Sequence, residues 1–259
     1  MAPPANLRPP GLRNVAIEQR LNEQLPLSLG FRDETGKAVR LGDYFGKKPV
    51  ILSLVYYRCP MLCSEVLAGL EGSLRALSFD AGKQFNVVTV SFDPKDSPEA
   101  ATQKKAVILK GYKRSGAAEG WHFLTGSQAS IDTLTRAVGF DYQYDPKTDQ
   151  FAHTTAIMVV TPQGRLSQYY YGVEYPPKDL RLGLIQASEN TIGTLADQVI
   201  LYCYHYDPQA GKYSAIISHI LQLGGGLTIV VIGILLTVLI RRDPHGESKE
   251  LNRSHQYVR

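Results

Sequence analysis

Two cysteines, Cys59 and Cys63, lie four positions apart, directly after the apolar run of residues 49–57. In a helix this spacing places both sulfurs on one face. The unpaired N–H groups and positive dipole of a helix N-terminus would lower the thiol pKa and favour thiolates. Two neighbouring thiolates can form a disulfide and exchange it, or they can bind a soft metal ion such as Cu(I). Because Pro60 and a strand-to-helix junction keep such a position accessible, we expect a reactive pair and not two inert buried cysteines.

The spacing of the pair bears on which chemistry it performs. Thioredoxin-type exchange uses two intervening residues, whereas this pair has one more, so the spacing fits a ligand pair at least as well as an exchange pair. Two thiolates leave a copper ion under-coordinated, and a third ligand is therefore expected. His153 is the candidate, because an imidazole at the edge of a loop could reach the sulfurs. On the residues alone, a histidine at a strand start is more typical of an ordinary surface position.

The elements that would position these residues follow from apolar periodicity and turn residues. The long apolar runs are typical of strands covered on both faces at the centre of an α/β sheet, and the cysteines would lie between the first of them and a helix that begins near Pro60. The order after an N-terminal hairpin indicates one α/β domain of about 170 residues. Strands are predicted at residues 27–31, 38–41, 49–57, 85–92, 121–124, 142–144, 152–160 and 165–172, and helices at 62–77, 97–112, 127–138 and 177–192.

The C-terminal part of the chain contains a stretch long enough to cross a membrane. No Lys, Arg, Asp or Glu occurs between Lys212 and Arg241, and residues 223–240 read LGGGLTIVVIGILLTVLI. A helix rises about 1.5 Å per residue, so this stretch could cross roughly 30 Å of bilayer hydrocarbon. We predict a single transmembrane helix over residues 215–240, in preference to a buried core helix.

The charges that flank this span predict its orientation. Five Lys and Arg residues follow it in residues 241–259, whereas the stretch before it carries only Lys212. The positive-inside rule places the tail in the cytoplasm and the main domain on the periplasmic or outer face of the cell membrane. Export needs a leader, and residues 1–21 contain no apolar core of a signal peptide. We therefore expect that a leader has been lost from the chain as given; the alternative is the opposite orientation.

The overall composition is an average over the main domain and the predicted span. The 259 residues carry a net charge of +4, which is too small to indicate nucleic-acid binding, and no basic block with interleaved aromatic residues occurs. A content of 44% hydrophobic and 20% charged residues excludes a disordered chain, and three cysteines exclude a scaffold of several disulfides. The mean hydropathy of −0.15 is that of an ordinary soluble protein, because it averages a polar domain with one apolar span.

Four segments occur in a characteristic order along the chain: VILSLVYYRCPMLC at residues 50–63, SFDPKDSP at 91–98, WHFLTG at 121–126 and FAHTT at 151–155. Together they resemble the SCO/SenC family. The first is similar to the family's strand leading into C-P-x-x-C, and the last is similar to its histidine segment. The resemblance extends over about residues 25–192. The chain departs from the usual pattern in its C-terminal span, because many members have an N-terminal anchor, and in Arg58, where a small polar residue is common.

The resemblance implies a thioredoxin-like fold and a role with copper. Members are implicated in copper delivery to, or thiol reduction of, the dicopper centre of cytochrome c oxidase. The implied copper ligands are Cys59, Cys63 and His153, for Cu(I), Cu(II) or both. The implied partners are the oxidase subunit that carries the dicopper centre and a thiol reductant or another copper carrier. A metallochaperone fits better than an enzyme, and the alternative is a thiol–disulfide oxidoreductase that uses the same cysteines as its redox pair.

Three further residues are accessory candidates. Asp93 lies at an acidic position characteristic of the family, where it could hydrogen-bond a thiol or a loop, or only support the fold. Cys203 and His205 form a C-x-H pair that could be a second, weak copper site, although an aromatic belt beside the membrane with an incidental cysteine explains them at least as well. We divide the chain into an N-terminal arm (1–24), the thioredoxin-like domain (25–192), a juxtamembrane segment (193–214), the transmembrane helix (215–240) and a cytoplasmic tail (241–259).

Overall fold

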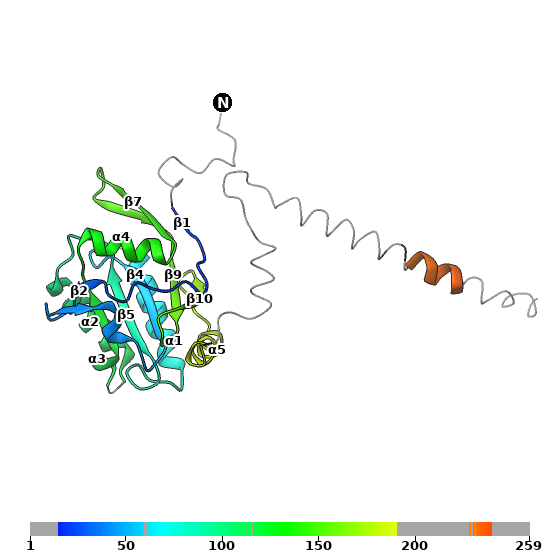
Figure 1. Cartoon of the computed structure of the whole chain (residues 1–259), viewed down its shortest axis with the longest axis horizontal. Coiled ribbons are helices and arrows are strands. Elements are labelled where there is room, and N and C mark those ends of the chain that lie inside the picture. Colours follow the sequence, from blue (N-terminus) through cyan, green and yellow to red (C-terminus); the bar gives the residue numbers. More distant parts are fainter. Residues whose placement is uncertain are drawn as a thin grey trace, which may run out of the picture. The chain divides into compact units, whose positions relative to one another are not determined.

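The computed structural model describes residues 15–59, 62–114, 116–190, 228, 230 and 232–239. The chain divides into two units, Met1–Leu195 and Ala196–Arg259. The strands and helices labelled in Figure 1 belong to the first unit.

A five-stranded mixed sheet in the order β10-β9-β4-β5-β6 forms the centre of the first unit (Figure 1). Strands β4 (Val50–Val55), β5 (Asn86–Ser91) and β6 (Trp121–Leu124) run parallel, and β9 (Ala156–Val160) and β10 (Leu166–Tyr171) continue the sheet antiparallel. Every residue of β4 and β9 is buried. Strand β9 is wholly apolar and β4 is apolar except for Ser53, as expected of strands with both faces covered, which confirms the predicted α/β class.

Hydrogen-bonded polar groups cross the centre of this sheet. Thr89 Oγ1 on β5 accepts a hydrogen bond from Trp121 Nε1 on β6 at 3.0 Å and shares one with Ser53 Oγ on β4 at 2.9 Å. All three residues are fully buried. Because each polar group has a partner, their burial carries no desolvation penalty for an unmade bond.

A helix follows each of the three parallel strands, as the periodicity predicts. Ser97 and Ser127 cap two of them, since their side chains accept hydrogen bonds from the N–H groups of Ala100 and Ser130. Helix α1 packs against α2 and α5, and α5 also packs on β9 and β10. The helices are α1 (Leu62–Ala76), α2 (Pro98–Tyr112), α3 (Ala117–Gly120), α4 (Gln128–Ala137) and α5 (Pro177–Ser188).

Two antiparallel hairpins flank the central sheet. Strands β2 (Gly30–Arg32) and β3 (Ala38–Arg40) form the predicted N-terminal hairpin, which is followed by the 3-10 helix η2 (Leu41–Tyr44). Its turn is closed by Asp33, whose Oδ1 accepts the N–H groups of Thr35 and Lys37. The second hairpin is formed by β7 (Phe140–Asp145) and β8 (Gln150–His153), beside α4 (Figure 1).

Two features of the second hairpin differ from the sequence-based expectation. The single strand expected at residues 152–160 is divided, because β8 pairs with β7 and β9 pairs with β4, so the chain leaves one sheet and enters another at Thr154 and Thr155. The short strand β1 (Ala16–Ile17), inside the expected N-terminal arm, pairs with the other edge of β7. Strand β7 is thereby the middle strand of a three-stranded sheet in the order β1-β7-β8.

Only part of the predicted membrane span can be compared with the structure. Thr228, Val230 and residues 232–239 are helical and exposed. Among the residues that the structure describes, no helix has both the length and the apolar character needed to cross a bilayer. The rest of residues 215–240, the juxtamembrane segment 193–214 with Cys203 and His205, the tail 241–259 and residues 1–14 of the arm lie outside the described residues.

Candidate metal centre

The two cysteines lie where β4 gives way to α1. Cys63 is in the first turn of α1, and its N–H group donates to Cys59 Sγ at 3.4 Å. The N–H group of Tyr56, the residue after β4, donates to Cys63 Sγ at 3.5 Å. Neither cysteine is in a disulfide and both are buried, with 8% of Cys59 and 1% of Cys63 exposed. The junction therefore shields the pair, contrary to the expected accessibility.

The electrostatic environment of Cys63 also differs from the expectation. A side-chain hydrogen bond with Cys59 and burial raise the pKa of the Cys63 thiol well above its ordinary value. The prediction that the helix N-terminus lowers the thiol pKa is therefore wrong for Cys63. The hydrogen bond with Cys59 and the desolvation of a buried thiolate outweigh the charge of Lys104 and the hydrogen bond from the Tyr56 N–H group, which act in the opposite direction.

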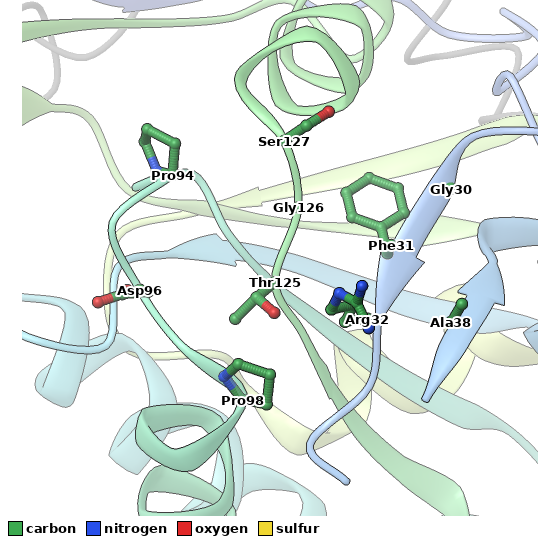
Figure 2. A pocket seen from close by; sticks show the side chains of 10 residues that line it. All are labelled: Gly30, Phe31, Arg32, Ala38, Pro94, Asp96, Pro98, Thr125, Gly126 and Ser127. Carbon is green, nitrogen blue, oxygen red and sulfur yellow. The ribbon is translucent and has the colours of Figure 1, made fainter. Parts of the chain in front are cut away.

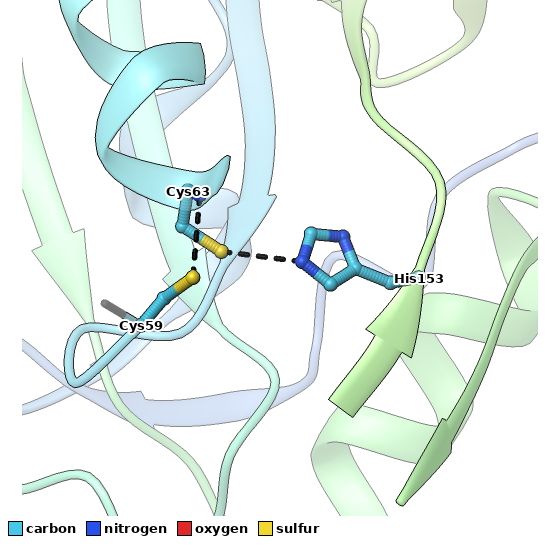
Figure 3. A group of neighbouring side chains, drawn as sticks. All are labelled: Cys59, Cys63 and His153. Carbon is cyan, nitrogen blue, oxygen red and sulfur yellow. Dashed lines mark hydrogen bonds between the residues drawn. The ribbon is translucent and has the colours of Figure 1, made fainter. Parts of the chain in front are cut away.

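His153 lies at the end of β8, with its ring against the cysteines (Figure 3). Its Nε2 atom is 3.4 Å from Cys63 Sγ, and its Nδ1 atom is 2.7 Å from the carbonyl oxygen of Thr154. A carbonyl oxygen only accepts, so Nδ1 carries the proton and Nε2 presents its lone pair to the sulfurs. The ligand atoms of the two cysteines and the histidine all lie within 4.8 Å of one another. The structure thus brings together the three residues named from the sequence.

Aromatic rings surround the histidine. The ring centroids of Phe92, Tyr56 and Phe140 lie 5.1, 6.0 and 6.1 Å from that of His153. Phe151 bridges this shell by packing against both Tyr56 and Phe92. Burial and a hydrogen bond with Cys59 raise the pKa of the Tyr56 phenol. These rings restrict the orientation of the imidazole and cover part of it, since His153 is half-buried.

Asp93 binds a loop and not a thiol. Its Oδ2 atom accepts from Arg58 Nη2 at 2.5 Å, and its Oδ1 atom accepts from the N–H group of Lys95 at 2.9 Å. Asp96, three residues on, accepts from Arg58 Nε at 3.1 Å and from the N–H group of Tyr57 at 2.6 Å. Both carboxylates are buried. The two acids therefore fix the segment that leads into Cys59, and Arg58 is directed to them instead of to the thiols.

Sequence reasoning did not assign roles to Asp96 or the aromatic shell, and for Arg58 it offered a lower thiol pKa or a solvent-facing side chain, not the ion pairs with Asp93 and Asp96. A sequence signal could have indicated Asp96, because it is the second acid of the segment SFDPKDSP, which begins at the end of a buried strand. The shell had none, since Tyr56, Phe92, Phe140 and Phe151 come from segments far apart in the sequence. Cys203 and His205 lie outside the described residues, so their role as ligands stays a prediction.

Comparison with known proteins agrees with this geometry. The model of the SCO1/SenC family matches residues 19–183, which is more than half of the chain. The SCO1 protein homolog of Bacillus subtilis (strain 168) is 27% identical over 154 residues, which cover 58% of this chain and 75% of that protein.

Solved structures share the fold. A protein from Aquifex aeolicus VF5 is 27% identical with a TM-score of 0.57, and the alignment covers 66% of this chain and 95% of the other. Arabidopsis thaliana ScoI with copper bound is 19% identical with a TM-score of 0.51, over 62% of this chain and 96% of the other. The predicted thioredoxin-like fold is confirmed, and from the extent of the family match the chain belongs to the SCO1/SenC family.

Proposed function

We propose that this protein binds copper through Cys59, Cys63 and His153 and assists assembly of the dicopper centre of cytochrome c oxidase. The observation that supports this most directly is the convergence of two sulfurs and one imidazole nitrogen within 4.8 Å. Thiolates and imidazole together suit Cu(I), and the same donors can hold Cu(II). Copper is the cargo of such a protein, so the role is that of a metallochaperone and not of an enzyme.

The surroundings of the three residues fit this role. The hydrogen bond from Nδ1 to the Thr154 carbonyl fixes the tautomer that presents Nε2 as a ligand. The raised pKa of the Cys63 thiol keeps the proton on the metal-free site. Copper binding would then release protons from the cysteines, because only the thiolates are ligands.

The proposed partners come from the family relationship. Residues 19–183 match the SCO1/SenC model, and ScoI of Arabidopsis thaliana has been solved with copper bound. By this relationship we propose the oxidase subunit that carries the dicopper centre as the recipient of copper. A thiol reductant or another copper carrier would supply the reduced, loaded form.

Metal analysis of the reduced chain tests the ligand set. We expect bound Cu(I) in the wild type and loss of tight binding in Cys59→Ser, Cys63→Ser and His153→Ala. His245→Ala is the matched histidine control, and the double variant Cys203→Ser with His205→Ala measures whether the C-x-H pair holds additional copper. Tight copper binding that survives His153→Ala unchanged would contradict the proposed site.

The second candidate function is that of a thiol–disulfide oxidoreductase. The contact between the Cys63 N–H group and Cys59 Sγ supports it, because it holds two cysteines that are not in a disulfide next to each other. Cys59 and Cys63 would cycle between dithiol and disulfide, with Cys59 as the attacking thiol. Oxidase assembly in cells separates the two functions: full activity of His153→Ala with loss in either cysteine variant would support the oxidoreductase.

We further propose that residues 215–240 anchor the chain in the cell membrane. The support is the absence of charged residues between Lys212 and Arg241 and the cluster of basic residues after the span. The main domain would then lie on the extracytoplasmic face, and residues 241–259 would lie in the cytoplasm.

A further inference from the structure

A cleft of about 400 Å³ lies beside the loop that carries Pro94 and Asp96 (Figure 2). One wall is formed by β2 with Phe31 and Arg32, and the opposite wall by Pro94 and Pro98. The floor is the segment of residues 125–127 between β6 and α4. The function proposed above does not use this cleft.

The backbone fixes Arg32 and Thr125 as neighbours in the cleft. The N–H group of each donates to the carbonyl oxygen of the other, at 2.8 and 2.9 Å, so their side chains stand on the same face of this antiparallel bridge. Gly126 lets the floor pass under the Phe31 ring, because a Cβ atom at this position would lie 2.7 Å from the ring. The cleft is therefore a fixed feature of the packing.

The cleft contains hydrogen-bond donors that could bind an anion. Thr125 is 96% buried, as 4% of it is exposed, yet no residue in the described part of the chain hydrogen-bonds its hydroxyl, which faces Arg32 in Figure 2. Arg32 donates from Nη1 to the carbonyl oxygen of Gly36, and no carboxylate of the described residues lies within ion-pair distance of its guanidinium. The first N–H groups of α4, at Gln128 and Ala129, are free in the manner of any helix N-terminus.

The nearby acids do not oppose an anion at this position. The carboxylate of Asp96 turns away from the cleft in Figure 2 and is bound by Arg58 and Tyr57. Glu34 pairs with Lys105, and Asp33 is held by its own turn. The charged group that faces the cleft without an acidic partner among the described residues is thus the Arg32 guanidinium. The rings of Phe31, Pro94 and Pro98 line the cleft around it.

We propose that this cleft binds an acidic peptide segment of a partner protein, with an Asp or Glu carboxylate on Arg32, Thr125 and the start of α4 and an adjacent apolar side chain between Phe31 and the two prolines. A carboxylate matches the planar guanidinium, and the rings select a carboxylate that is attached to an apolar chain. This rests on the proposed function in one respect: the partner is the protein with which the thiol site exchanges copper. Asp96 joins the two sites, because its backbone borders the cleft while its carboxylate holds the two residues before Cys59.

Peptide titration of the reduced full chain tests the proposal, with backbone N–H chemical shifts as the readout. The probe is the blocked peptide Ac-Gly-Phe-Asp-Phe-Gly-NH₂, and its matched control has Asn in place of Asp. We expect saturable shifts at residues 125–129 with the Asp peptide and at least about tenfold weaker binding of the Asn peptide. Arg32→Met should weaken binding of the Asp peptide by a similar factor, and Thr125→Val by about threefold or more. Lys178→Met, which removes an exposed charge on α5, should leave it unchanged.

Three results would overturn the proposal: equal binding of the two peptides, undiminished binding to Arg32→Met, or binding of free succinate as tight as that of the Asp peptide, which would make the cleft a site for small carboxylates. Copper analysis of the same samples separates this proposal from the function. Arg32→Met should keep the copper content of the wild type, and Cys59→Ser should keep its affinity for the peptide.

Discussion

Arg58 connects the segment before the cysteines to two buried acids. Its guanidinium forms ion pairs with Asp93 and Asp96, while about half of its own side chain is exposed. Removal of the cation leaves two buried carboxylates without their charged partner, which is a costly state in a protein interior. Stability at this site therefore depends on a residue that the family resemblance marks only as a departure from the usual pattern.

We predict that Arg58→Met lowers the free energy of unfolding by about 1–3 kcal/mol, less than for a fully buried pair because the guanidinium is half in solvent. Arg58→Lys should recover only part of this loss, since one ammonium group cannot contact both carboxylates as a guanidinium does. Urea denaturation of the reduced, copper-free chain measures the effect. An Arg58→Met variant as stable as the wild type would show that the two acids do not need the cation.

His122 makes the stability of the fold depend on pH. Burial, and secondarily the charge of Lys105, lower the pKa of this histidine in the folded state, where its ring packs 4.3 Å from that of Tyr44. The unfolded chain binds the proton with the ordinary pKa of about 6.5. As the pH falls through this value, the unfolded state is protonated first, so the free energy of unfolding decreases until the folded-state pKa is passed.

Replacement of His122 by Phe keeps a ring beside Tyr44 and removes the titrating group. We predict that the wild type loses more stability than His122→Phe between about pH 7.5 and about pH 5.5. Urea midpoints at several pH values, without copper, give the two curves. Parallel curves would show that His122 does not titrate differently in the folded and unfolded states.

The β7–β8 hairpin is the element that delivers His153 to the cysteines. Lys95, from the loop that carries Asp93 and Asp96, donates to Asp149 Oδ1 at 2.7 Å and to the Tyr144 hydroxyl at 3.2 Å. The tip of the hairpin is thus tied to the loop that fixes the segment before Cys59. The same loop therefore contacts both the hairpin that carries His153 and the segment that leads into Cys59.

We predict that Asp149→Asn weakens Cu(I) binding by no more than about fivefold, because exposed ion pairs contribute about 0.2–1 kcal/mol. Lys147→Met, at the same exposed turn, should leave the affinity unchanged, and exchange of the two charges in Lys95→Asp with Asp149→Lys should restore most of the loss. Competition with a chromophoric Cu(I) chelator measures all four proteins. Equal affinities in Asp149→Asn and the wild type would mean that the aromatic shell alone positions the hairpin.

The elements of the central sheet could be predicted from sequence because local patterns determine them. The buried runs in β4, β5 and β9 and the serine caps of α2 and α4 are signals within a few residues. The break between β8 and β9 had no such signal, since Thr154 and Thr155 are β-branched residues with a high strand propensity and no turn residue separates the two strands. Pairing of β1 with β7 is equally non-local, and two residues carry too little pattern to indicate a strand.

For the metal site, too, local features could be predicted from the sequence and non-local ones could not. The pair Cys59 and Cys63 has a local spacing, and His153 could be assigned through the resemblance of its segment to a family. The burial of both thiols, and with it the raised pKa of Cys63, depends on rings and loops contributed by distant parts of the chain. Local helix geometry predicted the opposite direction of the shift, because it omits the hydrogen bond with Cys59 and the desolvation of the buried thiol.

At the scale of the whole molecule, the chain combines a polar domain with an apolar C-terminal stretch. In the described part of that stretch, the apolar side chains are about half exposed, as in Leu235 at 60%. Leu182 on α5 of the domain is similarly exposed, at 53%. The two leucines therefore form a matched pair, one in the proposed span and one outside it.

We predict that Leu235→Arg moves the chain from the membrane fraction to the alkaline-soluble fraction of cells, whereas Leu182→Arg does not. An arginine inside the apolar part of a spanning helix opposes insertion, by up to about 2.5–3.5 kcal/mol at the helix centre and by less towards its ends, but the same change on an exposed helix of a soluble domain costs little. Fractionation after an alkaline carbonate wash distinguishes the variants, and copper content confirms that the domain has folded in each. A wild-type chain in the soluble fraction, or equal partitioning of the two variants, would contradict the anchor. Protease digestion of intact cells then tests orientation: because the basic residues of the tail favour the cytoplasm, the domain should be cleaved from outside and the tail protected.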